Sequence, residues 1–430
     1  MAEDSSVKRR LPAGIVDTGF ASLATFTVGL TAVVRFDDLD RGAYALFFSA
    51  FVMGSLVANE WIFTPAEVKA VSFPESERLS LLPRSLKLGI GPCLIGSTAS
   101  IVALTLTLSY ASVGVATGLA VTSAVLIVVS TMQSHVGRML HIAGHSTTAA
   151  AMSVTQFIVV LAGVWIGTAV GVPLAWLPFG TLALANSISM VLGLWVARDQ
   201  LRERAPTWLE FRELSKRGYW FVLNGAAPAL AGFAVAVVIS WLASPVDLGY
   251  AESARIVAQP VLVLAGGLSA VLGPRAIRAG LDRDSAQSRS MGRVYATLLL
   301  ILGGLYLLVV AGDWGLNPVA GVVPSAYVLT GLVALAVAAN VVAALTFLQG
   351  DELAGAGRER SLAGIAWFSA VFLLAGGLTA GVTGAYARSI GLIAGSSTRF
   401  VIQWLALRGV YRAPRPPEAS VIPPGRGSDR

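Results

Sequence analysis

The sequence predicts an all-α polytopic membrane protein with about twelve transmembrane helices in two pseudo-symmetric six-helix lobes. The first observation behind this prediction is a stretch, residues 88–197, that contains a single formally charged side chain, Arg138. A surface helix of a soluble protein has a charged face, whereas about 20 apolar residues suffice to cross a hydrocarbon layer of about 30 Å. The stretch must therefore cross the membrane several times, and Arg138 is expected at a turn on the membrane surface.

The composition of the whole chain supports the same fold class. Hydrophobic residues make up 55% of the 430 residues and charged residues only 13%, and the mean hydropathy is +0.72. These values are typical of multi-pass membrane proteins. Twelve spans leave little of the chain for a soluble catalytic domain, so we do not expect an enzyme. The single cysteine, Cys93, excludes an intramolecular disulfide.

Charged and turn-forming residues divide the chain into apolar segments of about 20 residues. Such continuous segments are too long for the alternating strands of a membrane β-barrel, so we interpret them as helices. The expected spans are residues 14–34, 42–63, 86–109, 112–134, 147–170, 174–197, 218–243, 249–272, 294–312, 325–348, 362–382 and 386–408.

The basic residues predict the orientation of these spans. If both termini are cytoplasmic, 26 of the 31 Lys and Arg residues fall on the inner side, and only five fall elsewhere. The outer connections are short and mostly acidic, with Asp37, Asp38 and Asp247 among their residues. The positive-inside rule therefore places both termini in the cytoplasm of a multi-pass protein of the plasma (inner) membrane. The net charge of +7 is explained by anionic inner-leaflet lipids, so no nucleic-acid partner is expected.

An internal repeat is the second organising feature. The predicted boundaries are residues 1–197 for the N-terminal lobe, 198–217 for a cytoplasmic connection, 218–408 for the C-terminal lobe and 409–430 for a disordered cytoplasmic tail. An offset of 207 residues aligns Asp17 with Asn224 and also the pair Asp40 and Gly42 with Asp247 and Gly249. Two parallel repeats of six helices are typical of transporters whose lobes rock about a site between them.

Ionisable side chains within the spans are the candidate functional residues, because they are costly in lipid and by default mark a cavity or pathway. In the eighth span, Arg255 follows Glu252 by three residues and Gln259 lies one turn further on. One interpretation is a structural Glu252–Arg255 ion pair near the outer interface. The other is a cavity in which the planar donor group of Arg255 holds an anion such as a phosphate.

Other span residues complete the candidate set. Arg399 lies near the middle of the last span, where it needs a buried partner or a water-filled cavity. Asp17 and its repeat equivalent Asn224 are candidates for ion coupling, although Asp17 also fits a solvated carboxylate near the surface. Arg35 is a weaker cavity candidate, because a basic residue at a span end is commonly an interface anchor.

Other chemistry is not expected. The sequence contains no GxxxxGK[ST] phosphate-binding loop. His141 and His145 have helical spacing, but neither a cysteine nor an acidic residue lies near them in the sequence. We therefore expect neither a metal site nor a cofactor.

Two segments of the sequence resemble a known family of membrane proteins. The segment GFASLATFTVGLTAVVRFDDLDRGAYALFFSAFV resembles the start of Wzx-type polysaccharide flippases, which belong to the multidrug/oligosaccharidyl-lipid/polysaccharide exporter (MOP) superfamily. The matching positions are Ser22, Phe26, Arg35, Asp40, Gly42 and Tyr44. The segment from Asp247 to Ile277 similarly resembles the eighth-helix region of that family and contains its inner-surface proline, here Pro274. The chain departs from the family at Thr25, where the family often has asparagine.

The resemblance implies a flippase that moves a lipid-linked oligosaccharide across the plasma membrane by alternating access during polysaccharide biosynthesis. The implied partners are the lipid-linked glycan, membrane lipids, a polysaccharide polymerase and glycosyltransferases. Two other functions remain open. One is a cation-coupled drug or metabolite antiporter of the same superfamily, with Asp17 as coupling carboxylate. The other is a non-transporting scaffold of a glycan-assembly complex.

Overall fold

The computed structural model of the protein describes residues 2–71, 73–201, 210–312 and 330–412. Within them, eleven helical segments are long and apolar enough to cross a membrane. The 38-residue helix α11 (Pro245–Asp282) is a twelfth by its length. The expected all-α membrane fold is therefore confirmed.

The N-terminal lobe consists of the first six spans. Its helices are α1 (Ala2–Arg35), α2 (Asp38–Ala58), α3 (Thr64–Val71), α4 (Leu82–Ser97), α5 (Ala99–Thr107), α6 (Val113–Ile142), α7 (Ser146–Ala169) and α8 (Leu177–Val196). The short helix α9 (Arg198–Leu201) follows α8. A π-helical turn, η1 (Asn59–Phe63), continues α2, and the 3₁₀ turns η2 (Glu75–Leu81) and η3 (Leu174–Trp176) precede α4 and α8.

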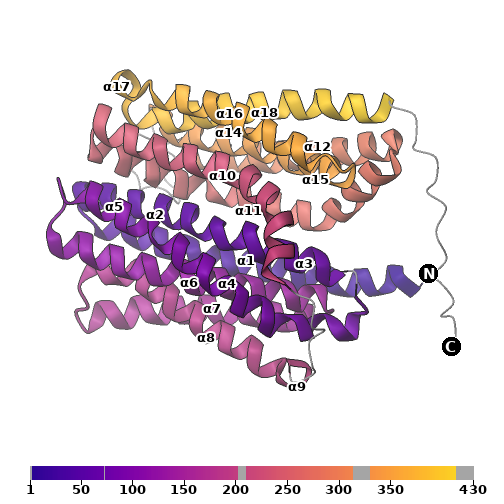
Figure 1. Ribbon diagram of the computed structural model, residues 1–430. Helices are drawn as coiled ribbons and strands as arrows, with labels where there is room; N and C mark the ends of the chain where they lie inside the picture. The colour runs from indigo at the N-terminus through magenta and orange to yellow at the C-terminus, as the bar shows by residue number, and fades with distance from the viewer. Residues whose placement is uncertain (1, 72, 202–209, 313–329, 413–430) are drawn as a thin grey trace, which may run out of the picture.

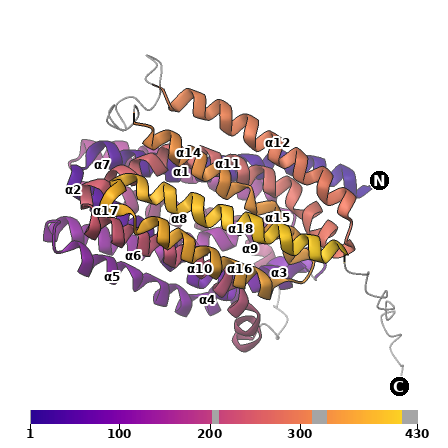
Figure 2. The same cartoon turned by 90° about the horizontal axis from the view of Figure 1, so that it is seen from above.

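The C-terminal lobe consists of the last six spans. Its described helices are α10 (Phe211–Leu242), α11, α12 (Ser285–Val310), α14 (Leu332–Ala344), α15 (Thr346–Gly355), α16 (Glu359–Gly377), α17 (Ala380–Thr383) and α18 (Ala387–Arg412), with the 3₁₀ turn η4 (Gly384–Tyr386) before α18. Figure 1 shows the two lobes stacked against each other, with α1–α9 below and α10–α18 above. Figure 2 shows α18 lying between α14 and α16 on the outer surface of the C-terminal lobe.

The two ends of the bundle differ in charge. Helix α1 begins and α18 ends at the same end, on the right in Figure 1. We call it the basic end because Arg78, Arg212, Arg283 and Arg358 lie in its connections or in the helix ends beside them. At the other end, called the opposite end, α1 is joined to α2 beside the acidic residues 37, 38 and 40.

Most predicted span boundaries agree with the helices to within a few residues, and the differences lie at the basic end. Helix α10 begins at Phe211, so the second part of the predicted connection 198–217 is helical; residues 202–209 are outside the described residues. Helix α18 continues to Arg412, beyond the predicted lobe boundary at 408, and residues 413–430 are outside the described residues. Arg138 lies within α6, which continues to Ile142, and the turn comes only after it.

The predicted repeat is visible in how α2 and α11 begin. Asp37 caps α2 by accepting a hydrogen bond from the backbone N–H of Asp40 (2.8 Å). Ser244, which is 207 residues later, caps α11 by accepting one from the backbone N–H of Asp247 (3.0 Å). A side-chain acceptor at this position satisfies one of the free N–H groups of the first helical turn. The aligned residues therefore start the second helix of each repeat in the same way.

The repeat equivalents Gly42 and Gly249 join the lobes at the opposite end. A Cβ on Gly42 would overlap the carbonyl oxygen of Pro245, and a Cβ on Gly249 would lie 3.3 Å from the carbonyl oxygen of Asp38. Pro245 is itself the repeat equivalent of Asp38, so the two contacts are related by the pseudo-twofold axis. Small residues permit such close approach of membrane helices. The opposite end is therefore closed by a symmetric backbone contact.

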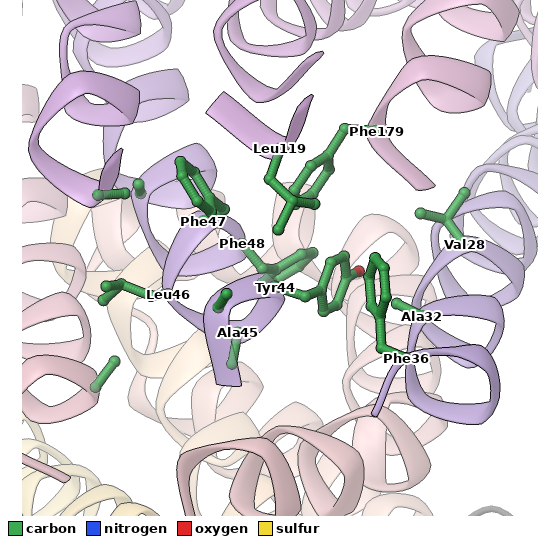
Figure 3. Close-up of a cluster of buried hydrophobic side chains, with 14 of the residues drawn as sticks. Val28, Ala32, Phe36, Tyr44, Ala45, Leu46, Phe47, Phe48, Leu119 and Phe179 are labelled. Atoms are coloured by element: carbon green, nitrogen blue, oxygen red, sulfur yellow. The ribbon is translucent and has the colours of Figure 1, made fainter. Parts of the chain in front are cut away.

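An aromatic cluster lies beside this contact in the N-terminal lobe. The ring of Tyr44 stacks on Phe179 with a centroid distance of 5.1 Å and lies 6.2 Å from both Phe36 and Phe48. Figure 3 shows these rings meeting between α1, α2 and α8. The cluster fixes the start of α2, which supplies half of the lobe contact.

Candidate functional site: polar groups within the spans

At the basic end, η1 and α3 of the N-terminal lobe contact α10 of the C-terminal lobe. The indole Nε1 of Trp61 donates to Ser215 Oγ (2.7 Å), and Lys69 Nζ lies 2.6 Å from the carboxylate of Glu213. Further into the membrane, a Cβ on Gly225 would lie 2.8 Å from the side chain of Leu56. These contacts join the N-terminal lobe to α10 of the other lobe.

The internal repeat relates α1 to α10 and α2 to α11, so the contact between α1 and α11 is the equivalent of the contact between α10 and α2. Helices α1 and α11 pack against each other over only part of their length. A Cβ on Gly29 would lie 2.9 Å from Ile256 Cδ1, so the two helices touch in the half nearer the opposite end. Towards the basic end, a Cβ on Gly267 would meet no atom within 4 Å. Gly267 is the repeat equivalent of Glu60, whose Cγ lies 3.3 Å from the position of a Cβ on Gly225. The lobes are thus in contact at the opposite end. Towards the basic end, α10 covers Glu60 of the first repeat, whereas no atom covers the equivalent residue Gly267 of the second repeat.

Arg255 and Glu252 form a buried ion pair. Arg255 Nε and Nη2 donate to the two carboxylate oxygens of Glu252 at 2.8 and 2.6 Å, and Arg388 of α18 donates to the same carboxylate at 2.9 Å. The guanidinium of Arg255 also lies over the ring of Phe48, 4.1 Å from its centroid. Gln259 is half-buried one turn further along α11. The structure thus contains the structural ion pair that was one of the two interpretations of Arg255, with Arg388 as an additional partner.

Arg399 and Asn224 line one cavity of about 390 Å³ in the C-terminal lobe. Its walls also include Trp220 and Phe221 of α10 and Asp351 of α15. With the amide of Gln403 oriented to satisfy its neighbours, its oxygen accepts from Arg399 Nε at 3.3 Å and its nitrogen donates to the carbonyl oxygen of Thr346 at 3.2 Å.

Two polar groups in this cavity keep hydrogen-bonding capacity for a ligand. In the part of the chain that the structure describes, no carboxylate lies within ion-pair distance of Arg399. Likewise, Asn224 Oδ1 is buried without a hydrogen-bond partner among the described residues. Asp351, by contrast, accepts a hydrogen bond from Ser269 Oγ at 3.1 Å. The cavity therefore presents a guanidinium, an amide and two aromatic side chains beside the carboxylates of Asp351 and Glu359.

Asp17, the repeat equivalent of Asn224, lies in a different environment. His141 Nε2 of α6 lies 2.7 Å from Asp17 Oδ2, and Ser153 of α7 donates to its other carboxylate oxygen. Asp17 and His141 both retain about a quarter of their side-chain exposure, 24% and 27%. The carboxylate is therefore held between three helices of its own lobe and remains accessible to an ion.

Arg35 does not line the cavity that contains Arg399. It lies exposed in the last turn of α1 at the opposite end. This position agrees with the interpretation of Arg35 as an interface anchor. The geometry does not support the interpretation of Arg35 as a cavity residue.

A buried network around Glu67 was not predicted from the sequence. Glu67 accepts from Arg138 Nε at 2.8 and 2.9 Å, and His135 Nδ1 lies 2.7 Å from the same carboxylate. His135 is fully buried, stacks on Phe63 with a centroid distance of 4.3 Å, and its Nε2 lies 2.7 Å from Ser85 Oγ. The lone charge of residues 88–197 is therefore paired inside the lobe. Among the described residues, no group of three His, Cys, Asp or Glu side chains could hold a metal ion.

Glu60 was also not predicted as a site residue, although its position in the sequence indicated one. It is an ionisable residue within the predicted span 42–63, the criterion that selected the other candidates. It lies in the π-helical turn η1 and lines a second cavity of about 340 Å³ between α2 and α6.

Comparison with solved structures identifies the architecture. An inward-facing multidrug-resistance transporter of the MATE family, in the MOP superfamily, matches with a TM-score of 0.72 and 14% identity, over 93% of this chain and 98% of the other. The chain has the MATE transporter fold. An outward-facing structure with the same description matches with a TM-score of 0.65 at 15% identity, over 94% and 95% of the chains. The transporter VcmN of Vibrio cholerae matches with a TM-score of 0.65 at 15% identity, over 96% and 99%.

The MATE fold agrees with the superfamily that the sequence resembles, whereas the flippase resemblance stays a prediction. At such low identity, the likeness concerns the fold. No protein-family model and no curated protein matches the chain at the level of sequence.

Proposed function

We propose that this protein is a secondary transporter that moves its substrate across the membrane by alternating access of its two lobes. The asymmetric closure of the lobes carries this proposal: α2 and α11 meet at the opposite end, and towards the basic end Gly267 of α11 faces open space. Structures of the same fold are described as inward-facing and outward-facing conformations. The TM-score is higher for the inward-facing one, which agrees with closure at the opposite end.

In this proposal the basic end faces the cytoplasm. The charge asymmetry of the connections supports this orientation. The transporter then lies in the plasma membrane with the uncovered face of α11 at Gly267 towards the inner side.

We favour a cation-coupled antiporter of drugs or metabolites. Asp17 supports the coupling part, because it is a half-buried carboxylate beside a histidine and a serine hydroxyl. A carboxylate in a span that is held by hydrogen-bond donors can bind a proton or a sodium ion and release it when access changes. Arg255 and Arg388 share Glu252, which leaves few free cations within the described spans to bind an anionic substrate.

A flippase for a lipid-linked oligosaccharide is the second candidate, and Arg399 favours it. A guanidinium that faces a cavity without a carboxylate partner can hold a pyrophosphate through paired hydrogen bonds. The expected partners in that case are a polysaccharide polymerase and glycosyltransferases.

Transport by purified protein in liposomes tests the antiporter. We expect efflux of a fluorescent cation such as ethidium when a proton or sodium gradient is imposed in the opposite direction. Asp17→Asn should abolish the response to the gradient and leave protein abundance unchanged. Gradient-driven efflux that is equal in the wild type and in Asp17→Asn would exclude Asp17 as the coupling site.

Glycan export in cells separates the second candidate from the first. Arg399→Ala should cut export without lowering the amount of protein in the membrane if the protein is a flippase. Normal export by this variant, together with loss of export on deletion of the chain, would instead indicate the scaffold function.

A further inference from the structure

The Arg399 cavity contains side chains of opposite charge that do not pair with each other. Its volume of about 390 Å³ is within the range of small-molecule sites, roughly 300–1,000 Å³. Arg399 of α18 and Asp351 of α15 both line it, yet among the described residues neither lies at ion-pair distance from a group of opposite charge. Unpaired charges inside a transmembrane lobe are costly, so a ligand that carries both complementary charges would stabilise the two residues together.

The guanidinium of Arg399 is positioned to bind a carboxylate. Its Nε donates to the side-chain oxygen of Gln403 at 3.3 Å, and the amide nitrogen of Gln403 donates to the carbonyl oxygen of Thr346. Gln403 is fully buried, so it fixes the orientation of the guanidinium. Within the described residues, the two terminal nitrogens of Arg399 have no acceptor. They lie in one plane and match the two oxygens of a ligand carboxylate.

Asp351 and Asn224 provide acceptors for an ammonium group. The carboxylate of Asp351 accepts one hydrogen bond, from Ser269 Oγ, and keeps its other acceptor positions. Gly273 leaves room for this carboxylate, because a Cβ there would lie 2.8 Å from Asp351 Oδ2. Asn224 Oδ1 is buried without a partner among the described residues. An ammonium group has three donors, so it can satisfy both residues at once.

Aromatic side chains form the apolar part of the cavity wall. Trp220 and Phe221 come from α10, and Phe347 comes from α15. One water molecule occupies about 30 Å³ in the liquid, so the cavity has room for roughly a dozen atoms of that size. A free amino acid with an aromatic side chain has this size, and a bare metal ion would leave most of the volume empty.

We propose that this cavity binds a zwitterionic metabolite with the size and chemistry of an apolar α-amino acid. Arg399 binds its carboxylate, Asp351 and Asn224 bind its ammonium group, and the aromatic residues contact its side chain. An organic cation would leave Arg399 without a counter-charge, and a pyrophosphate would be repelled by Asp351. This site deepens the proposed antiporter function, on which its biological role rests, by naming the class of metabolite.

Equilibrium binding to the purified full-length protein in detergent, measured by isothermal titration calorimetry at neutral pH, tests this site. The probe is L-phenylalanine. Two analogues each lack one of its charges: phenethylamine has no carboxylate, and 3-phenylpropanoate has no amine. We expect L-phenylalanine to bind about tenfold or more tightly than either analogue, since each analogue loses charge-assisted hydrogen bonds.

Two variants remove one charge each from the protein. Arg399→Gln should weaken binding of L-phenylalanine by about tenfold or more and leave binding of phenethylamine unchanged. Asp351→Asn should weaken binding of L-phenylalanine similarly and leave binding of 3-phenylpropanoate unchanged. The analogue that is still bound shows that each variant is folded. Arg408→Gln, which changes an exposed arginine of the same helix α18, should bind all three probes like the wild type.

Three results would overturn the zwitterion site. They are undetectable binding of L-phenylalanine, an affinity for it that is unchanged in both variants, and binding of one analogue as tightly as L-phenylalanine. Gradient-driven ethidium efflux in a protein that does not bind L-phenylalanine would overturn the site alone and leave the proposed function standing. Binding that depends on both Arg399 and Asp351, in a protein without gradient-driven efflux, would support the site and count against the transporter.

Discussion

Gly218 of α10 lies so close to Trp61 of η1 that a Cβ on the glycine would overlap the tryptophan carbonyl oxygen. The indole of the same Trp61 donates to Ser215, one turn earlier in α10. The backbone and the side chain of one residue therefore both hold the lobes together at the basic end.

Gly218→Ala should destabilise the protein by about 1–3 kcal/mol, because the added methyl group forces α10 away from η1. Thermal unfolding in detergent measures the effect. The matched control is Gly232→Ala in the same helix, where a Cβ would meet no atom within 4 Å. This control should be neutral or slightly stabilising, since alanine favours a helix more than glycine does. Equal melting temperatures for the two variants would contradict the close contact.

Gly42→Ala should open the opposite end. The new methyl group would overlap the carbonyl oxygen of Pro245, whereas the equivalent change Gly249→Ala meets its nearest atoms at 3.3 Å and should act more weakly. Spin labels at the exposed Leu39 and Val382 report the separation of the lobes there. The distance distribution measured by electron paramagnetic resonance should move to longer values in Gly42→Ala, and unchanged distributions in both variants would refute the symmetric closure.

Tyr44→Phe should leave the protein as stable as the wild type or more stable. The hydroxyl of Tyr44 is fully buried and has no hydrogen-bond partner within the described residues, so its removal relieves an unsatisfied group. Tyr295→Phe is the matched change, because Tyr295 donates to the carbonyl oxygen of Ala344 at 2.9 Å. This second variant should lose about 1 kcal/mol of stability. A larger loss in Tyr44→Phe than in Tyr295→Phe would show that the Tyr44 hydroxyl does have a partner.

Single cysteines should establish the orientation. The native Cys93 is fully buried, so the background of labelling is low. In intact cells a membrane-impermeant maleimide should label Leu39→Cys at the opposite end but not Glu77→Cys at the basic end. After permeabilisation both should react. The reverse pattern would place the basic end outside the cytoplasm.

The spans were predictable because lipid imposes length and apolarity on each segment independently of its neighbours. The repeat was predictable for a similar reason, since the turn before Gly42 and the turn before Gly249 use the same local capping chemistry. Features of this kind depend only on residues that are close together in the sequence, so they can be predicted without knowledge of the tertiary structure.

The partners of the polar side chains were not predictable in the same way. Asp17 meets His141, which is 124 residues away, and Glu252 meets Arg388 across 136 residues. Which helices become neighbours depends on tertiary packing. Sequence reasoning could therefore select Arg255 and Arg399 as unusual, but only the structure separates the paired arginine from the one that faces a cavity.

The open space beside Gly267 has a consequence for how ligands arrive. This face of α11 carries no side chain at Gly267 and has no atom within 4 Å of a Cβ there, so a molecule dissolved among the lipid chains can reach it sideways without first entering water. The relevant ligand concentration is then the one in the inner leaflet. Hydrophobic amines and lipid-anchored molecules become concentrated there by partitioning, and their apparent affinity should rise with their lipid solubility even when the contacts inside the protein are the same.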